Sequence, residues 1–204
     1  SPGKHLTSRR SFLGATSAAT TASLTTQALA SRRPVHSAQN DDGNLKLGLV
    51  GCGGRGAGAA NQALTADDKV TLHAMCDLDR GVLDKAVEIL VKNQPDRVDV
   101  PEERRFDTFQ GYKRVIEECD VVILATSPGF RPQHFEEAVA QGKHVFMEKP
   151  VASDVNGIKR VLAAGEQAKA KNLKVAVGLQ RRHQPGYQEW VKRIQDGAIG
   201  DLLV

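Results

Sequence analysis

The sequence predicts an α/β protein built on a doubly wound parallel sheet. Short apolar runs alternate with segments of helical periodicity from residue 45 onward. A glycine-rich turn at residues 51–56 joins the first apolar run, residues 45–50, to the first helical segment, residues 57–64. A later run, residues 121–125, is apolar at every position, as expected for a central parallel strand that is covered on both faces.

The glycine turn has glycine at all three positions of the G-x-G-x-x-G pattern. In such a unit Gly51 allows the tight turn, Gly53 lets the backbone approach a pyrophosphate, and Gly56 lets the helix pack on the strand. Gly54 lies at the start of the helix, whose free N–H groups and partial positive charge favour phosphates. Arg55 either braces the pyrophosphate or points to solvent. The turn therefore predicts a dinucleotide-binding site.

A second apolar run, residues 70–76, ends in Asp77 about 20 residues past the last glycine of the turn. An acid at this separation bonds the ribose hydroxyls of the adenosine in dinucleotide-binding folds. Asp77 could instead cap the next helix, but Asp79 lies directly before the helical pattern and suits that role better. The two acids disfavour a 2′-phosphate and so favour NAD, while Arg80 leaves NADP as an alternative.

Helical and extended segments continue to alternate beyond this acid. Residues 82–90 repeat apolar side chains at helical spacing, and a charged loop with two prolines follows over residues 93–105. Residues 105–107 predict a short third strand, and residues 111–118 predict a short helix. The apolar residues expected to face the core are Val82, Leu83, Ala86, Val87, Leu90, Tyr112, Val115 and Ile116.

The other half of the sheet begins with the apolar run 121–125. This run ends in a loop that starts at Thr126 and lies at the carboxyl end of the sheet, where ligands bind in such folds. Residues 131–141 predict a helix. Residues 144–147 predict a strand that continues directly into residues 148–150, with the sequence Glu-Lys-Pro.

Three further elements complete the predicted pattern. Residues 154–171 predict a long helix, residues 174–179 a strand, and the segment from Pro185 a final helix. Residues 202–204 begin another apolar run. The residues expected to face inward on the two helices are Ile158, Val161, Leu162, Ala168, Tyr187, Trp190, Val191 and Ile194.

The first 30 residues predict an export signal. Paired Arg9 and Arg10 stand before Phe12 and Leu13, and a mildly apolar tract follows that closes with Ala-Leu-Ala at residues 28–30. This pattern is typical of a twin-arginine signal peptide with a small-x-small cleavage site. The tract is too short and too rich in Thr and Ser for a membrane span. The alternative is a disordered basic tail, and in both cases residues 31–44 form a polar linker.

The bulk composition argues against nucleic-acid binding and against a disulfide framework. The formal net charge is +4, but the leader carries Lys4, Arg9 and Arg10 and no acid, so little of this charge belongs to the predicted domain. An aromatic content of 4% offers no platform for base stacking. Three cysteines without CxxC spacing are expected to be buried fillers, and no pattern predicts a metal site.

Together these motifs resemble the Gfo/Idh/MocA oxidoreductases, a family that includes glucose–fructose oxidoreductase and inositol dehydrogenase. The resemblance rests on the glycine turn, on Asp77, on the loop 125–128 and on the stretch 142–150 with its Glu-Lys-Pro ending. Residues 178–187 are similar to the family's G-x-x-R-R-(aromatic)-x-P-x-Y stretch, although His183 replaces the aromatic residue. Glu-Lys-Pro at a strand end is the most specific of these motifs.

The resemblance implies a Rossmann domain that binds NAD or NADP over residues 45–180. It also implies that residues 181–204 begin a second α/β domain, which in the family forms the substrate wall and the oligomer interface and usually supplies a His acid/base. We therefore expect a fragment of a homo-oligomeric protein. Thr126 and Glu148 are expected to contact the cofactor, Glu148 on the nicotinamide ribose side.

Lys149 is the leading catalytic candidate. A lysine at the carboxyl end of a strand, beside the nicotinamide, can hold a substrate hydroxyl by a hydrogen bond and contact the cofactor. Its charge stabilises the alkoxide as hydride leaves the carbon, and burial can lower the pKa of a lysine toward working pH. Residue type alone would favour a solvated surface lysine, and only the Glu-Lys-Pro context favours function.

The basic run after the last predicted strand supplies the other site candidates. Arg181 and Arg182 are predicted to bind substrate oxygens or a carboxylate, with a salt bridge at the sheet edge as the alternative. His183 is a second catalytic candidate, although a structural role is the alternative. Tyr187 is assigned to the substrate site by the similar stretch. His134 is expected to be a core histidine.

Three functions fit these observations. The leading one is an exported, periplasmic NAD(P)-dependent oxidoreductase that transfers hydride between the nicotinamide and a sugar or polyol. A second is a glycoside hydrolase of the same fold that oxidises and later reduces its sugar, so that NAD is recycled. A third is a sugar-sensing binding protein without catalysis.

Overall fold

The computed structural model describes residues 43–201. The predicted signal peptide, most of the predicted linker and the apolar residues 202–204 lie outside the described residues. Among the described residues, no helix has the length and apolar character that a membrane span requires. The same part of the chain contains no group of three His, Cys, Asp or Glu side chains that could hold a metal ion.

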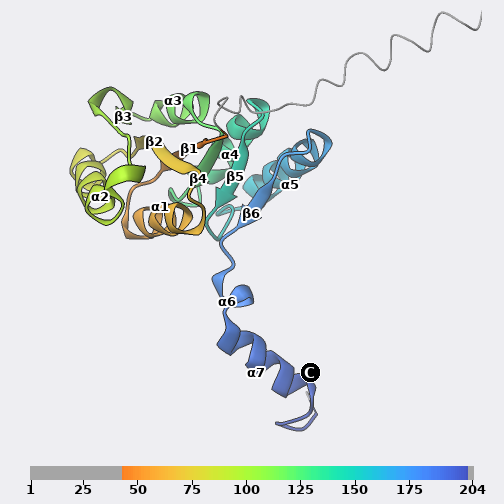
Figure 1. Ribbon diagram of the computed structural model, residues 1–204. Helices are drawn as coiled ribbons and strands as arrows, with labels where there is room; N and C mark the ends of the chain where they lie inside the picture. The colour runs from red at the N-terminus through yellow and green to blue at the C-terminus, as the bar shows by residue number, and fades with distance from the viewer. Residues whose placement is uncertain (1–42, 202–204) are drawn as a thin grey trace, which may run out of the picture. The chain divides into compact units, whose positions relative to one another are not determined.

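Six parallel strands form one sheet with the order β3-β2-β1-β4-β5-β6 (Figure 1). This is the order of a doubly wound dinucleotide-binding sheet, so the predicted fold class is confirmed. The strands are β1 (Leu45–Val50), β2 (Val70–Cys76), β3 (Arg105–Phe106), β4 (Val121–Leu124), β5 (His144–Met147) and β6 (Val175–Val177).

Helices cover both faces of the sheet and enclose two apolar cores. On one face α1 (Gly54–Ala66) and α2 (Arg80–Asn93) pack over β1 and β2. On the other face lie α3 (Gly111–Glu118), α4 (Arg131–Ala140) and α5 (Val155–Ala170) (Figure 1). The loop between α2 and β3 contains two 3-10 turns, η1 (Pro95–Arg97) and η2 (Glu102–Arg104). All three cysteines are buried and free.

The last elements differ from the sequence prediction. Ile158 and Leu162 of α5 are 41% and 65% exposed, because this helix packs on the sheet through the small residues Gly157, Ala164 and Ala168. Strand β6 at the sheet edge is itself short and exposed, so it offers little surface for the larger side chains to cover.

The chain beyond β6 also departs from the expected pattern. The strand predicted over residues 174–179 is three residues long, and the residues after it form a short helix, α6 (Gln180–His183). The final helix, α7 (Pro185–Gln195), is present as predicted but buries none of its residues. Its Trp190 is 67% exposed, so the predicted inward face has no cover among the described residues.

The strand register gathers the strand ends into a single row. Val50 pairs with both Cys76 and Leu124, and Leu124 pairs with Met147. Cys76 pairs with Phe106, and Met147 pairs with Val177. The residues that follow these strand ends therefore lie along one edge of the sheet, in the order Asp107, Asp77, Gly51, Ala125, Glu148 and Gly178.

Candidate functional site

The glycine turn lies at the point where the order of the sheet reverses, between β1 and β4. Gly51 has φ +95°, and a Cβ atom there would lie 2.6 Å from the backbone nitrogen of Thr126. A Cβ atom on Gly56 would overlap the carbonyl oxygen of Gly51. The protein's own packing therefore requires glycine at both positions. Gly53 caps the N-terminus of α1, and a Cβ atom on it would meet no protein atom within 4 Å.

Asp77 fastens the end of β2 to this turn. One carboxylate oxygen accepts a hydrogen bond from the Cys52 backbone N–H at 2.6 Å, and the other accepts one from the Asp79 N–H at 3.1 Å. Asp79 in turn caps α2 by accepting from the Val82 N–H, as predicted. A carboxylate has about four acceptor positions, so Asp77 keeps capacity for ribose hydroxyls.

A cavity of about 350 Å³ opens beside the turn and Asp77. Its rim carries two aromatic rings, Phe109 after β3 and Phe130 before α4, whose centroids lie 6.4 Å apart. An adenine base can pack against such apolar surfaces, and Asp77 lies where the attached ribose would need an acceptor. The cavity is lined by Val50, Gly51, Gly53, Cys76, Asp77, Leu78, Thr108, Phe109, Gln110, Tyr112, Ala125, Thr126, Ser127, Phe130, Gln133 and His134.

Arg55 and Glu148 connect the glycine turn to the end of β5. A guanidinium nitrogen of Arg55 lies 2.6 Å from a carboxylate oxygen of Glu148, whose side chain is only 5% exposed. A Cβ atom on Gly178 would come within 2.5 Å of the same oxygen, so the carboxylate packs directly against the end of β6. Neither interpretation of Arg55 from the sequence included this ion pair.

Arg131 connects the loop after β4 to the loop after β5 through its guanidinium group. Its side chain is almost fully buried, and its guanidinium donates to the backbone carbonyls of Thr126, Glu148 and Pro150, at 2.6 Å for Glu148. Burial lowers the pKa of Arg131, and the nearby charge of Glu148 opposes that shift. Because the carbonyls of Glu148 and Pro150 flank Lys149, the guanidinium fixes the backbone that carries the leading catalytic candidate.

Lys149 and the predicted substrate residues lie in a second depression. This depression has a volume of about 610 Å³ and is lined by Lys149, Gly178, Leu179, Gln180, Arg181 and Arg182. The guanidinium of Arg181 stacks over the ring of Tyr187 at 5.1 Å. His183 ends α6, is exposed and lines neither cavity, so its catalytic role stays a prediction.

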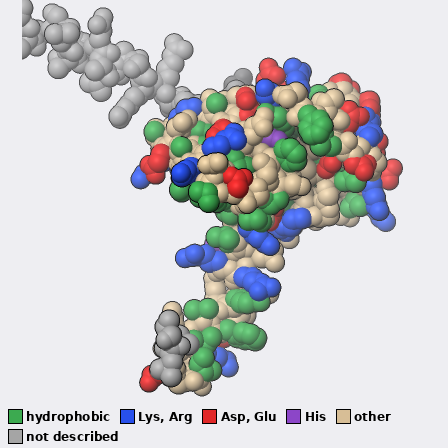
Figure 2. All heavy atoms as spheres, turned by 180° about the vertical axis from the view of Figure 1, so that it is seen from behind, with side chains coloured by type: hydrophobic (Ala, Val, Ile, Leu, Met, Phe, Trp, Pro, Cys, Tyr) green, Lys and Arg blue, Asp and Glu red, His purple; other side chains and the backbone are tan. Residues whose placement is uncertain are grey.

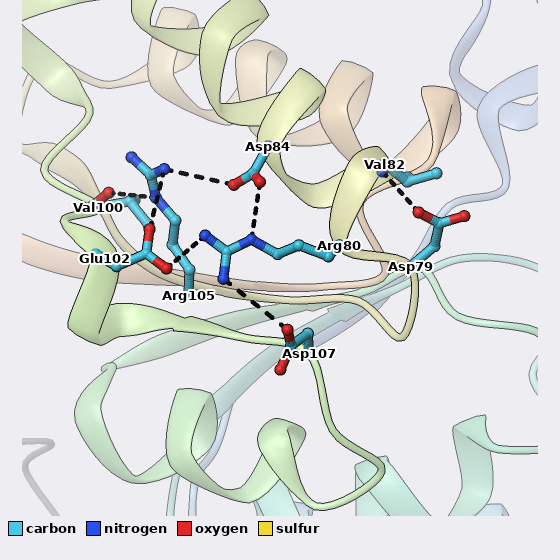
Figure 3. Close-up of polar contacts among 8 residues, drawn as sticks. All are labelled: Asp79, Arg80, Val82, Asp84, Val100, Glu102, Arg105 and Asp107. Atoms are coloured by element: carbon cyan, nitrogen blue, oxygen red, sulfur yellow. Dashed lines mark hydrogen bonds and ion pairs between the residues drawn. The ribbon is translucent and has the colours of Figure 1, made fainter.

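Arg80, the residue that left NADP as an alternative, is already paired with acids (Figure 3). Its guanidinium donates to Asp84 at 2.8 Å and to Glu102 at 2.5 Å, and it lies 3.9 Å from Asp107. These hydrogen bonds raise the pKa of Arg80, and Arg80 lowers the pKa of Asp84. No Lys or Arg is among the described residues that line the cavity, so a ribose at Asp77 would have no cation beside it to neutralise a 2′-phosphate.

His134 is a buried histidine, as predicted, and it also lines the cavity. Its Nδ1 lies 3.2 Å from the hydroxyl oxygen of Thr126, and its ring packs on Tyr112 with centroids 4.2 Å apart. Burial, with a contribution from the charge of Arg131, lowers the pKa of His134 to about 4. The ring is therefore neutral at physiological pH.

Sequence reasoning missed Arg131 and the aromatic rim of the cavity. The rim residues Phe109 and Phe130 lie beyond strand ends, and Phe109 follows the shortest strand, where the pattern was weakest. A position beyond a strand end is the signal that could have found them. Arg131 gave no such signal, because charged residues before a helical proline are usually exposed.

The sheet order, the glycine turn and the acid at the end of β2 define a Rossmann-type dinucleotide-binding domain. A family model described as "Oxidoreductase family, NAD-binding Rossmann fold" matches residues 45–179. The chain therefore belongs to the Gfo/Idh/MocA family, and the resemblance inferred from its motifs is confirmed.

The similar proteins include several inositol dehydrogenases. The inositol 2-dehydrogenase of Ralstonia nicotianae is 32% identical over 164 residues, which cover 78% of this chain and 44% of that protein. A structure of scyllo-inositol dehydrogenase from Lactobacillus casei with bound NAD(H) and scyllo-inositol is 27% identical, with a TM-score of 0.60. It covers 78% of this chain and 43% of that one, so the chain spans less than half the length of these relatives.

Replacing Arg131 tests its part in holding the site together. We expect Arg131→Met to reduce the free energy of unfolding by about 2–4 kcal/mol, because buried carbonyls lose their donors. Arg160→Met is the matched control, since Arg160 forms an exposed ion pair with Glu136 on the same face and its loss should cost below about 1 kcal/mol. Urea unfolding measures both, and equal losses would contradict this role.

The buried His134 predicts a pH dependence of stability. The unfolded chain binds a proton near the ordinary His pKa of 6.5, whereas the folded chain binds it only near pH 4. Stability from this group is therefore complete above about pH 6.5 and falls as the pH drops toward 4. Unfolding free energies across this window should fall less steeply in His134→Gln, by up to about 1.4 kcal/mol per pH unit. Equal slopes in both proteins would refute the prediction.

Proposed function

We propose that the protein containing this chain is an NAD-dependent oxidoreductase that oxidises or reduces a CH–OH group of a sugar or polyol. The observation that carries the proposal is the arrangement of two depressions along one row of strand ends. The nucleotide cavity contains Asp77, and the neighbouring depression contains Lys149. The ion pair between Arg55, which lies in the glycine turn, and Glu148, at the end of β5, connects the nucleotide cavity to the depression around Lys149.

The residues present fit NAD in separable roles. The glycine turn and the N-terminus of α1 would hold the pyrophosphate, Asp77 the ribose of the adenosine, and the aromatic rim the adenine. Glu148 would lie on the nicotinamide side, where its carboxylate is already oriented by Arg55. The chemistry that NAD supplies when bound is acceptance of a hydride from the substrate carbon.

Lys149 would act on the substrate oxygen. Its ammonium has three donors, so it can hold a hydroxyl and stabilise the negative charge that develops on that oxygen. The side chain is exposed, and its backbone neighbours are fixed by Arg131. A His acid/base from the second domain and a homo-oligomeric assembly stay predictions from the family resemblance.

Lys149→Met separates catalysis from cofactor binding. We expect kcat of the full-length protein to fall by at least about 100-fold, because the group that stabilises the substrate oxygen is lost. The affinity for NAD, measured by titration calorimetry, should change little. Lys159→Met on the exposed face of α5 is the control and should retain full activity. Unchanged turnover by the Lys149 variant would exclude the proposed role, and absence of NAD binding in the unaltered protein would exclude the function.

We also propose that the protein is exported in folded form to the periplasm. Arg9 and Arg10 before Phe12 and Leu13 support this, and folding before export lets a protein carry a nucleotide with it. In a twin-arginine pathway, replacing both arginines by lysine should retain the protein in the cytoplasm of the host cell. Cell fractionation of the two forms tests this, and equal periplasmic amounts would refute it.

A further inference from the structure

We propose that the depression around Lys149 recognises an anionic group, a carboxylate or a phosphate, on the sugar or polyol substrate. The inference rests on the proposed function and narrows its substrate class. Three of the six residues that line the depression are cationic, namely Lys149, Arg181 and Arg182, and none is acidic. Figure 2 shows Lys and Arg side chains gathered on the segment that follows the sheet.

The two arginines differ from the rest of the described chain in how their guanidinium groups are used. Every other described arginine has its guanidinium on a carboxylate or a backbone carbonyl. Within residues 43–201, the guanidinium of Arg181 has only its contact with the ring of Tyr187, and the side chain of Arg182 has no polar partner. The salt bridge at the sheet edge that the sequence left as an alternative is therefore not formed in this part of the chain.

The carboxylate of Glu148 does not compensate for these charges. Glu148 immediately precedes Lys149, but its side chain is buried and its oxygen is paired with Arg55 at 2.6 Å. The carboxylate also packs against Gly178, on the side of the sheet edge away from solvent. The described residues that line the depression therefore present cations to the substrate, while the charge of Glu148 is paired with Arg55.

The geometry suits an anion better than a neutral hydroxyl. Tyr187 supports the Arg181 guanidinium by stacking, which orders it without using its N–H donors. A planar guanidinium with free donors matches a carboxylate or phosphate with two parallel hydrogen bonds. Lys149 remains available for the reacting hydroxyl of the same molecule. The substrate that fits is a sugar or polyol with one reacting CH–OH group and one anionic substituent.

The test compares three sugars that differ at one carbon: glucose, glucuronate and glucose 6-phosphate. Each is titrated into the full-length protein saturated with NAD. We expect at least one of the two anions to bind about ten-fold or more tightly than glucose, as hydrogen bonds to a charged group predict. The difference should shrink in about 0.5 M salt. Preference for glucuronate alone identifies a carboxylate site, and preference for the phosphate ester alone identifies a phosphate site.

Variants assign the effect to the depression. Arg181→Gln and Arg182→Gln should each weaken anion binding by about ten-fold and weaken glucose binding by a smaller factor, so that the anion preference falls. Arg193→Gln is the matched control, because Arg193 lies on α7, is paired with Glu189 and lies outside the depression. Equal binding of glucose and both anions, failure of both anions to bind, or an anion preference that survives in both variants would overturn the inference. Failure of the proposed function has a different signature, since the protein would then not bind NAD in the preceding titration.

Discussion

The arrangement of the site depends on one buried cation. Removing a guanidinium from water is costly, and Arg131 offsets that cost through the carbonyl oxygens of Thr126, Glu148 and Pro150 and through the nearby charge of Glu148. These acceptors belong to the loops that follow β4 and β5, which are neighbours in the sheet. The loop at Thr126 lies against Gly51, so the same contacts also fix the wall of the nucleotide turn. Together with the pairing of β4 and β5, this side chain fixes the loop at Thr126 relative to Lys149.

The parallel sheet aligns the loops that Arg131 connects. Its register aligns the last residues of the strands, so the polar residues just beyond them form a row rather than a scattered set. Asp77 and Glu148 stand in this row on the two sides of the glycine turn; Asp77 already accepts hydrogen bonds from backbone N–H groups, and Glu148 is ion-paired with Arg55. The protein therefore holds both acids in place without a ligand, and such preorganisation lowers the cost of binding a ribose.

The sequence was sufficient for most of the sheet, because strand, turn and acid each have a local signature. Gly51, Gly56 and Asp77 were placed correctly for this reason. The prediction that Leu162 of α5 faces the core was wrong. Periodicity shows that Leu162 shares a helix face with other apolar residues, but it does not show whether anything covers that face. Arg131 was missed because two of the three carbonyls that its guanidinium contacts, those of Glu148 and Pro150, lie 17 and 19 residues away in the sequence, and no local pattern shows such a contact.

The contact between Gly51 and Thr126 has a consequence for the order of folding. The two residues touch through their backbones although most of the nucleotide domain's first half separates them in sequence. When only β1, α1 and β2 have emerged from the ribosome, the chain contains the whole glycine motif but not the loop at Thr126 that packs against it. That loop follows β4, and Arg131, which fixes it, is the first residue of α4. Formation of the nucleotide pocket is thus a non-local event that waits for chain closure across the sheet, and local helix formation alone cannot start it.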